Sequence, residues 1–492
     1  MKKNRFEITV FVCGALSMAL ELVAARIFSP YVGSSNLIWT TIIGMILIFM
    51  SLGYYIGGKV ADKKQDIDIL RFLLYISIIY VAVLPILEVI VLEPFAGLGL
   101  PLIVTAIIMS ILLFGFPSLV FAFFSPFSVK LKQMECDDNK EKIGEISGKM
   151  SAYSTIGSIL GTFITGFWLI PTIGTRGLIL LITIILAVLI MFLEEKIDVK
   201  TIFRNMFLVV AIVIVFLIGK LVYTVQHPEI VRDVDSEYSR IQVKEFVNAY
   251  GDEIKFMQVG NVGAESLVYK QTGTIGDYLY YYDLSNYYLE NNKNILMIGG
   301  AAYTYPTYFY KKEENKDIKM DVVEIDEVMT KLAVEEFELD LTNPSLNVIH
   351  QDGRSYINYT DEKYDTILVD AFKGTSVPFE LTTKEALQNM YNILNDNGLV
   401  ITNVISALEG KDSDFLKYEY STYKAVFDDV KVFYVDTSEK EENQNTIIIG
   451  IKGKINENKL KEEVYKKILE TEIKDYTSDK DIVTDNLAQI GN

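Results

Sequence analysis

Seven long apolar runs in the first half of the chain constrain its fold more than any other feature. They cover residues 6–28, 37–57, 70–92, 99–124, 150–170, 177–193 and 205–224. Each run approaches the roughly 20 residues that a helix needs to cross the hydrocarbon core of a bilayer. A helix also satisfies its own backbone hydrogen bonds, as lipid requires. The runs therefore predict a multi-span bundle of about seven transmembrane helices in the cell membrane.

Basic residues alternate between the loops of this half, which indicates an orientation in the membrane. They cluster before the first run and after the second, fourth and sixth runs, at Lys2, Lys3, Arg5, Lys59, Lys63, Lys64, Lys130, Lys132, Lys140, Lys142, Lys196, Lys200 and Arg204. The opposite loops carry almost none, Arg176 being the exception. Because cytoplasmic loops are enriched in Lys and Arg, we expect the N-terminus in the cytoplasm. Seven crossings from there favour an extracytoplasmic position for the second half of the chain.

Charge and residue usage exclude several classes of function. Residues 1–225 hold 18 basic and 15 acidic residues, whereas the remainder holds 28 basic and 49 acidic residues. An acidic second half repels phosphates, so no nucleic acid is expected as a partner. Cys13 and Cys136 are too few for a disulfide framework or a cysteine zinc site. With only His227 and His350, a histidine metal site and a Ser–His–Asp triad are not favoured, and we expect no metal.

Two charged residues, Glu21 and Arg26, lie within or at the edge of the first apolar run, where charge is expensive. Five residues turn a helix by about 140°, so these side chains do not pair neatly with each other. We expect each to face the bundle interior and to find a partner on another helix. Two interpretations stay open: a structural polar clasp or snorkelling arginine, and part of a substrate path. Two pairs of small residues predict close helix packing, Gly53 with Gly57 and Gly157 with Gly161.

From about Glu229 the pattern becomes that of a soluble domain. SEYSRIQVKEF and EIKFMQVGNVGAESLVYK alternate like short antiparallel strands, and the Tyr-rich GDYLYYYDLSNYYLE has helical spacing. Strands and helices then alternate, which predicts a parallel sheet with crossover helices, closed by an antiparallel pair. The expected domains are a helical membrane domain over 1–225, a small β subdomain with a Tyr-rich helix over 229–292, a Rossmann-like domain over 293–455, and a helical, acidic tail over 456–492.

Glycines and carboxylates stand where the expected parallel strands end. NILMIGG ends in Gly299 and Gly300, MDVVEID carries Glu324, LNVIHQDG ends in Asp352 and its glycine, and YDTILVD ends in Asp370. Glycine lets the backbone approach a ligand, and an acidic residue after the second strand can accept hydrogen bonds from ribose hydroxyls. Together these positions predict a nucleoside site. IGGAAYTY lacks the later glycines of G-x-G-x-x-G, so a dinucleotide site is not favoured.

These motifs give the chain a resemblance to a known family. GYYIGGKVAD, SAYSTIGSILGTFITGF, VEIDE, QDG and VDAFKGTSVPFELTT stand in the order found in the membrane-fused branch of the spermidine synthases, the polyamine aminopropyltransferases. Residues of about 236–452 carry the resemblance to the soluble enzymes. It implies an α/β domain of the class I methyltransferase type with a small N-terminal β subdomain, fused to a multi-span helical bundle.

The resemblance also implies roles for particular residues. Glu324 would bind the ribose of decarboxylated S-adenosylmethionine, or S-adenosylmethionine, as donor, or of the product methylthioadenosine. Asp352 and Gly353 would contact the adenine end, and Asp370 would accept the proton of the attacking amine. Further nucleoside contacts and a catalytic tyrosine are implied at Gly299, Gly300, Pro378 and Tyr281.

The acceptor pocket departs from the family pattern. The family's Tyr-His-Glu segment reads Tyr281, Tyr282 and Asp283, Ala302 stands where an amine-binding Asp is usual, and Lys373 replaces the second Asp of Asp-Ser-Ser-Asp. A diamine such as putrescine is a dication and needs carboxylates at both ends. Lys373 beside Asp370 would repel an ammonium and lower the pKa of the base. We therefore expect putrescine to be a poor substrate, and an acceptor with a carboxylate or phosphate to suit Lys373 better.

Three functions remain open at this point. The first is a membrane-anchored, spermidine-synthase-like transferase whose acceptor amine is not identified. The second is a catalytically degenerate nucleoside-binding domain that senses ligand for, or gates, the bundle, and the third is a transporter with a structural appendage. Since adenosyl donors are made in the cytoplasm, the transferase interpretation conflicts with seven crossings. The oligomeric state is open as well, a homodimer included.

Overall fold

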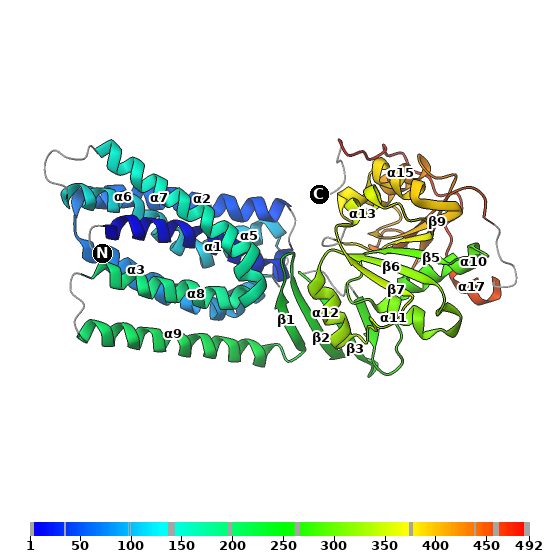
Figure 1. Ribbon diagram of the computed structural model, residues 1–492, viewed down its shortest axis with the longest axis horizontal. Coiled ribbons are helices and arrows are strands. Elements are labelled where there is room, and N and C mark those ends of the chain that lie inside the picture. The colour runs from blue at the N-terminus through cyan, green and yellow to red at the C-terminus, as the bar shows by residue number, and fades with distance from the viewer. Residues whose placement is uncertain are drawn as a thin grey trace. The chain divides into compact units, whose positions relative to one another are not determined.

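The structure is a computed structural model that describes residues 4–33, 36–96, 98, 100–135, 143–194, 199–260, 266–372, 377–436, 439–455 and 462–486. The chain separates into two compact units, Met1–Gln242 and Val243–Asn492. The first consists mainly of long helices, and the second is built around a seven-stranded sheet (Figure 1). The division falls after the change of hydropathy near residue 229, because the strand that follows this change packs against the helices.

Long apolar helices make up most of the Met1–Gln242 unit. They are α1 (Arg5–Val32), α2 (Asn36–Lys63), α3 (Ile67–Leu87), α4 (Glu93–Ala96), α5 (Leu102–Ser110), α6 (Phe116–Glu135), α7 (Ile143–Ile164), α8 (Ile170–Leu193) and α9 (Val199–Gln226). Single π-helical segments join α3 to α4, α5 to α6, and α7 to α8, at Glu88–Leu92, Ile111–Gly115 and Thr165–Leu169. Within the described residues, six continuous helices are long and apolar enough to cross a membrane, judged by length and composition alone.

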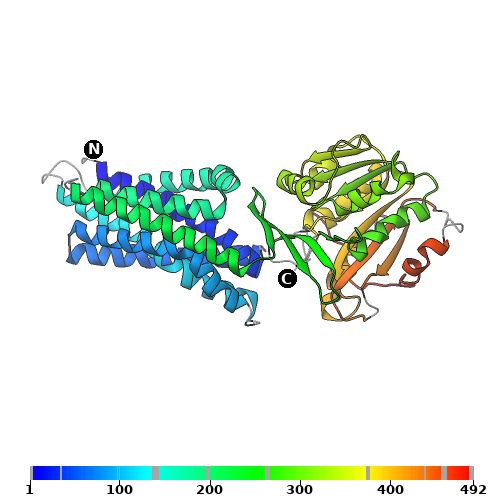
Figure 2. The ribbon, with the colours of Figure 1, turned by 90° about the horizontal axis from the view of Figure 1, so that it is seen from below.

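The fifth of these six helices explains the difference from the seven expected runs. It covers Ile143–Leu193, and its 51 residues at about 1.5 Å each exceed twice the thickness of a hydrocarbon core. The helix is broken at Gly174, where φ is 69° and ψ is 168°. α7 and α8 lie along the bundle as two separate arms (Figures 1 and 2). The segment that counts as one continuous helix therefore contains two of the expected apolar runs, 150–170 and 177–193.

The predicted small-residue pairs lie where helices touch. A methyl group added at Gly53 in α2 would lie 2.1 Å from the backbone oxygen of Leu119 in α6. One added at Gly157 in α7 would lie 2.0 Å from the backbone oxygen of Phe11 in α1. For the second glycine of each pair the corresponding distances to the same neighbouring helix are 2.6 Å at Gly57 and 2.4 Å at Gly161. The packing role that the sequence predicted for these glycines is confirmed.

A small sheet and a Tyr-rich segment follow the bundle. The strands β1 (Ile230–Asp235), β2 (Arg240–Val247), β3 (Glu253–Val259) and β4 (Ser266–Tyr269) form a sheet in that order. Within the second unit, β3 and β4 are antiparallel, with Met257 opposite Ser266. The Tyr-rich segment begins as a 3-10 helix, η5 (Asp277–Leu284), and continues as the short α10 (Ser285–Tyr288). The expected helical spacing is thus mostly that of a 3-10 helix.

The large sheet has the predicted arrangement. Its strands are β5 (Asn294–Ile298), β6 (Lys319–Glu324), β7 (Leu346–His350), β8 (Tyr364–Val369), β9 (Leu394–Ser406), β10 (Asp429–Tyr434) and β11 (Gln444–Ile451). They lie in the order β10-β11-β9-β8-β5-β6-β7, and β5 to β9 are parallel. β11 is antiparallel to both β9 and β10, so β10 again points the same way as β9. The expected α/β domain of the class I methyltransferase type is confirmed.

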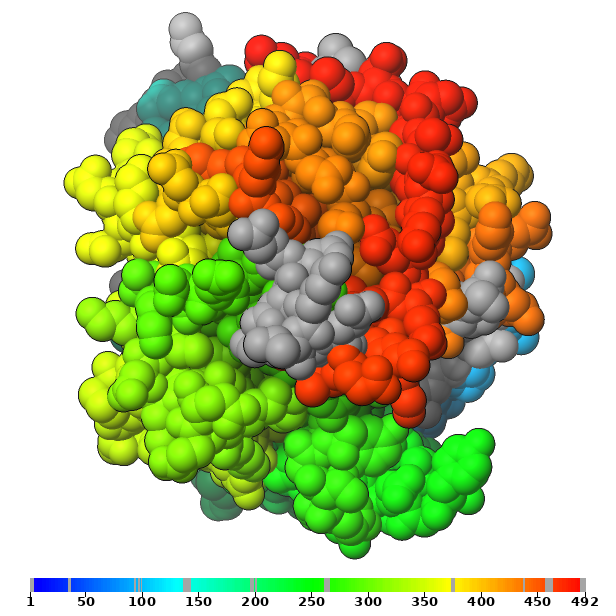
Figure 3. All heavy atoms as spheres, turned by 90° about the vertical axis from the view of Figure 1, so that its right-hand side faces the viewer, coloured from blue at the N-terminus to red at the C-terminus, as the bar shows by residue number. Residues whose placement is uncertain are grey.

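Helices cover both faces of this sheet (Figures 1 and 2). They are α11 (Thr304–Lys311), α12 (Glu327–Glu336), α13 (Gly353–Tyr359), α14 (Phe379–Thr382), α15 (Lys384–Ile393), α16 (Asp414–Lys424) and α17 (Glu462–Leu469), with 3-10 turns η6 (Glu313–Asn315) and η7 (Lys411–Ser413). One core packs η5, α10, α11 and α17 against the sheet, and the other packs α13, α15 and α16. The chain after α17 lies against α16 through Lys480 and Val483 (Figure 3, red against orange).

Candidate active site at the carboxyl ends of β5 and β8

β5 and β8 are neighbours at the point where the strand order of the large sheet reverses. The chain continues from β5 to β6 on one side and from β8 to β9 on the other. In open α/β sheets, ligands bind at the carboxyl ends of the strands at such a point. Asp370 directly follows β8, and its N–H donates to the oxygen of Ile298 over 2.8 Å. A methyl group at Gly299, where φ is 90°, would lie 2.3 Å from the oxygen of Asp370, so this close approach requires glycine.

The carboxylate of Asp370 is only partly hydrogen-bonded. The hydroxyl of Tyr278 donates to its Oδ2 over 3.3 Å. Among the described residues, its Oδ1 and the neighbouring hydroxyl of Tyr282 are buried with no partner at hydrogen-bonding distance. Burial raises the pKa of Asp370 from 3.8 to about 7, against the lowering effects of Tyr282, Asn403 and Tyr278. A carboxylate that titrates near neutrality and keeps one oxygen free suits a general base.

A cavity of about 250 Å³ opens beside Asp370. Its lining includes Tyr278 and Asn403, which are also neighbours of Asp370. It is completed by Leu267, Tyr269, Ile275, Gly276, Asp277, Phe372, Ile405, Asp436 and Asn445. Asp277 and Asp436 are carboxylates, and the described lining contains no lysine or arginine. The cavity is therefore anionic.

Asp277 and Asp436 were not identified from the sequence, although one of them carried a usable signal. Asp436 comes just after β10, which points the same way as the parallel strands. It therefore reaches the same edge of the sheet as Asp370. Asp277 opens η5 and shows no such pattern, because a 3-10 turn does not fix which side chain faces a distant strand.

Glu324 is placed at the end of β6, as predicted, and it binds the backbone of the first strand-to-helix turn. Its Oε2 accepts hydrogen bonds from the N–H groups of Gly300 at 2.8 Å and Ala301 at 3.1 Å, and its Oε1 accepts one from Asp326 at 2.9 Å. Burial raises the pKa of Glu324, although these three N–H groups favour its ionised form. The carboxylate thus fixes the turn after β5, and its assigned contact with a ribose stays a prediction.

Asp352 and Pro378 each stand directly before a helix. The Oδ1 of Asp352 accepts the N–H of Ser355 over 2.7 Å and caps α13, while the residue as a whole is exposed. A methyl group on Gly353 would lie 2.6 Å from the side chain of Ile298, so this turn packs on the end of β5. Pro378 precedes α14. These positions lie at the expected edge of the sheet, and their nucleoside contacts stay predictions.

The implied catalytic Tyr281 and the described residues assigned to the acceptor pocket make different contacts. The hydroxyl of Tyr281 donates to the backbone oxygen of Tyr434 over 2.9 Å. Asp283 pairs with Lys312 over 2.7 Å and accepts hydrogen bonds from two tyrosines of α11. Neither lines the cavity beside Asp370, whereas Tyr282 is a neighbour of that carboxylate.

The structure describes Ala302, one of the two remaining residues assigned to the acceptor pocket, but not Lys373. Ala302 is fully buried and its N–H donates to Ser266 Oγ over 3.3 Å. Lys373 lies outside the described residues. The lowering of the base's pKa that Lys373 would cause therefore stays a prediction, whereas burial raises the pKa of Asp370. Asp277 and Asp436 place two carboxylates in the cavity beside Asp370 that the comparison with the family motifs did not include.

The two polar residues of the first apolar run also lie apart. Arg26 donates from Nη2 to the backbone oxygen of Glu237 over 2.7 Å, in the turn between β1 and β2. Glu21 is half-buried in α1. No group of three or more His, Cys, Asp and Glu side chains within the described residues is arranged to hold a metal ion.

Comparisons with known proteins agree on one region of the chain. Residues 283–462 match the family model described as the spermine/spermidine synthase domain. The polyamine aminopropyltransferase of Vibrio vulnificus (strain CMCP6) is 31% identical over 164 residues, which are 32% of this chain and 50% of that protein. The polyamine aminopropyltransferase of Thermococcus onnurineus (strain NA1) is 30% identical over 171 residues, which are 34% of this chain and 58% of that protein.

A solved structure shows a weaker similarity over a larger region. The crystal structure of a probable spermidine synthase from Corynebacterium glutamicum ATCC 13032 covers 52% of this chain and 97% of that one, at 19% identity and a TM-score of 0.41. The chain thus spans about half the length of the curated relatives it matches.

Proposed function

With residues 283–462 forming a spermine/spermidine synthase domain, we propose that this unit is an aminopropyltransferase. It transfers the aminopropyl group of decarboxylated S-adenosylmethionine to an amine and releases methylthioadenosine. One observation carries the proposal: Asp370 stands at the switch point of the sheet with a pKa of about 7 and a buried, unpartnered oxygen. Those are the properties of a base that must take a proton from an ammonium near neutral pH.

The chemistry needs little beyond positioning and one proton transfer. The amine nitrogen forms a bond to the aminopropyl carbon beside the sulfonium, and the bond between that carbon and sulfur breaks. The electron pair of the broken bond goes to sulfur, which becomes the neutral thioether of methylthioadenosine. Asp370 takes the proton of the amine on Oδ1. The hydroxyl of Tyr278, which donates to Oδ2 over 3.3 Å, orients this carboxylate.

The acceptor that this site favours is a cationic amine. Asp277 and Asp436 give the cavity beside Asp370 two negative charges, which attract an ammonium held away from the reacting nitrogen. The volume of about 250 Å³ is sufficient for a short diamine chain. This proposal reverses the expectation that putrescine is a poor substrate, since that expectation counted only Ala302 and Lys373.

Turnover by the purified full-length protein tests the proposal. The donor is decarboxylated S-adenosylmethionine, and the acceptors are putrescine, spermidine and γ-aminobutyrate. We expect turnover of the two cationic amines, and we expect Asp277→Asn and Asp436→Asn each to raise their KM by roughly tenfold, the equivalent of about 1.4 kcal/mol. Asp412→Asn, on the exposed turn η7, serves as the matched control.

The outcomes of this assay separate the candidate functions. Turnover of γ-aminobutyrate alone would favour the acceptor suggested by Lys373. A thermal shift with methylthioadenosine but no turnover of any amine would leave a nucleoside-binding domain without catalysis. Absence of both would refute the transferase proposal.

We also propose that the bundle spans the cell membrane with the N-terminus in the cytoplasm. The alternation of basic loops and the break at Gly174, which divides one long helix into two arms, support seven crossings. The C-terminal unit would then be extracytoplasmic. A cysteine at the exposed Tyr250, in a Cys136→Ser background, tests this through a membrane-impermeant thiol reagent on intact cells.

The topology test needs a control on the opposite side. Lys64→Cys, after α2, should react only after lysis, whereas Tyr250→Cys should react in intact cells. Reaction of both cysteines only after lysis would place the C-terminal unit in the cytoplasm, where adenosyl donors are made, and would mean that one helix does not cross.

A further inference from the structure

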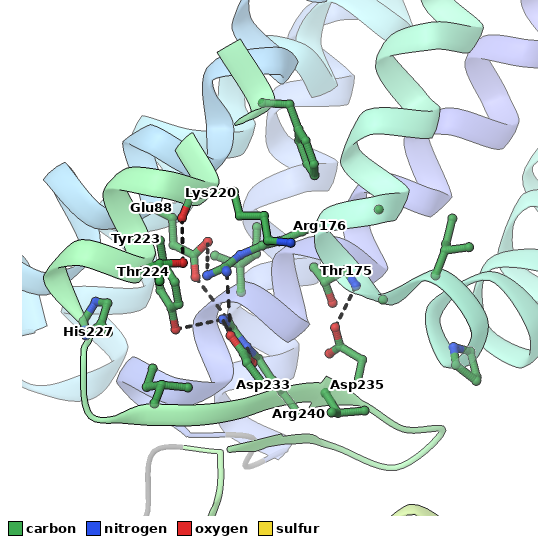
Figure 4. A pocket seen from close by; sticks show the side chains of 18 of the residues that line it. Glu88, Thr175, Arg176, Lys220, Tyr223, Thr224, His227, Asp233, Asp235 and Arg240 are labelled. Atoms are coloured by element: carbon green, nitrogen blue, oxygen red, sulfur yellow. Dashed lines mark hydrogen bonds and ion pairs between the residues drawn. The ribbon is translucent and has the colours of Figure 1, made fainter. Parts of the chain in front are cut away.

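The Met1–Gln242 unit contains a second cavity, at the end of the bundle next to β1. It has a volume of about 630 Å³, within the range of small-molecule sites. Its walls come from the bend in α8, the last turns of α9 and the strands β1 and β2 (Figure 4). Apolar side chains such as Ile27, Phe216 and Val231 line it together with six charged residues.

Four of these charges neutralise one another inside the wall. Arg240 is buried and pairs with Glu88 at 3.0 Å and with Asp233 at 2.8 Å. Arg176 lies 3.9 Å from Glu88 and 3.8 Å from Asp233, with its guanidinium 3.5 Å from the centre of the Tyr223 ring. Burial would raise the pKa of Asp233, but the two arginines hold it at about 2. Two arginines and two carboxylates thus form a balanced cluster.

The other two charges face the cavity without a charged partner in the described part of the chain. Lys220 projects from α9 and Asp235 from the end of β1, on opposite walls (Figure 4). No ion pair or side-chain hydrogen bond joins Lys220 to another described residue. Asp235 accepts the N–H of Thr175 on Oδ2 over 2.7 Å, but its Oδ1 is buried without a partner.

Two more polar atoms at this cavity have no partner at hydrogen-bonding distance in the part of the chain that the structure describes. The hydroxyl of Thr175, a residue only 2% exposed, is one, and Nη2 of Arg176 is the other. Unpaired buried polar groups destabilise a protein by about 1–3 kcal/mol each unless something else satisfies them. The cavity therefore offers donors at Lys220 and Arg176 and an acceptor at Asp235.

We propose that this cavity binds a small zwitterion, with its ammonium on Asp235 and its anionic group on Lys220 and Arg176. A lone anion would leave Asp235 unpaired, and a lone cation would leave Lys220 unpaired. Only a ligand that carries both charges satisfies both walls. Two sources supply this chemistry: a free amino acid, and the phosphoethanolamine headgroup of a membrane lipid.

Calorimetry on the purified full-length protein in detergent tests the proposal. The probes are glycine and O-phosphoethanolamine as zwitterions, with ethanolamine and inorganic phosphate as their separate halves. We expect a zwitterion to bind at least tenfold more tightly than either half, which corresponds to about 1.4 kcal/mol. Lys220→Met and Asp235→Asn should each remove that advantage, and Lys220→Arg should retain it. Asparagine is chosen because its side-chain oxygen still accepts the N–H of Thr175.

A second experiment, with lipids, identifies the source of the ligand. The protein is placed in nanodiscs of equal phosphatidylethanolamine and phosphatidylglycerol, and lipid that stays bound is measured by native mass spectrometry. Retention of phosphatidylethanolamine by the wild type, and its loss in both variants, would assign a headgroup. Binding of glycine with no lipid preference would assign a free amino acid.

Matched substitutions control for general effects of charge and stability. Lys149→Met and Asp62→Asn change a lysine and an aspartate elsewhere in the same unit, both in surface ion pairs. They should leave binding unchanged, and melting temperatures confirm that each variant is folded. Absence of zwitterion binding in both experiments, or equal binding by wild type, Lys220→Met and Asp235→Asn, would overturn the proposal.

Discussion

Replacing Asp370 by asparagine should abolish activity and stabilise the protein in the same experiment. The substitution keeps the size of the side chain and removes its ability to ionise. As the general base, Asp370 is expected to contribute about 10²–10⁴-fold to turnover. Burial of its carboxylate disfavours the ionised form, which is the source of its raised pKa. The ionisable carboxyl group of Asp370, which the reaction needs, therefore lowers the stability of the folded protein at neutral and higher pH.

The sign and size of this effect follow from the pKa. The folded pKa of about 7 lies above the ordinary value of 3.8, so the folded state binds the proton more tightly than the unfolded state. Below pH 3.8 both states are protonated and Asp370 costs nothing. As the pH rises to 7 the unfolded state loses the proton first, and stability falls. The full difference is at most about 4 kcal/mol, of which about 2 kcal/mol develops between pH 5 and pH 7.

Melting curves of the full-length wild type and Asp370→Asn between pH 5 and pH 9 measure this difference. For a unit of this size, 1 kcal/mol corresponds to about 2–4 °C. We expect the melting temperature of the variant to exceed that of the wild type by several degrees at pH 8, and by less at pH 5. The kcat/KM of the wild type should rise with pH and level off above about 7. A variant that is inactive but less stable at pH 8, or a pH-independent difference, would refute the reasoning.

Three further predictions concern other parts of the chain. Glu324→Ala should abolish the stabilisation by methylthioadenosine, which for the wild type at 100 times Kd is about 2.7 kcal/mol, as thermal-shift titration would measure. Gly53→Ala should destabilise the bundle by about 1–3 kcal/mol, because the added methyl group overlaps a carbonyl of α6, whereas Gly44→Ala, with open space around it, should not. Glu88→Gln should destabilise the first unit by about 3–5 kcal/mol, because Arg240 stays buried with a weakened partner, and a melting temperature equal to that of the wild type would contradict this.

Much of the fold could be predicted because it depends on local patterns. Apolar runs predict the helices. The four parallel strands β5 to β8 each end at or close to a glycine or a carboxylate, so the edge that carries Gly299 and Asp370 was identified correctly. The number of continuous helices differed by one, since the break at Gly174 is short and leaves the apolar pattern of its flanks unchanged.

The candidate site was less predictable because its side chains come from distant parts of the sequence. Asp277 and Asp436 line the same cavity, and this could be predicted only with the position of β10 at the edge of the sheet known. The raised pKa of Asp370 was also not predicted, since it depends on burial in the folded protein, and the lowering expected from Lys373 stays a prediction. Arg26 likewise donates to the backbone oxygen of Glu237, a contact that the spacing of charged residues along a helix does not predict.

The break at Gly174 connects the topology of the bundle with the second cavity. Non-helical backbone at membrane depth is stable only where its freed polar groups find partners in the protein. The freed N–H of Thr175 finds one in Asp235, and a methyl group at Gly174 would lie 3.4 Å from that same carboxylate. The next residue along the bend, Arg176, brings its guanidinium to the charge cluster. The break within α8 therefore also builds one wall of the cavity, so the proposed seven-crossing topology and the proposed zwitterion site depend on the same few residues.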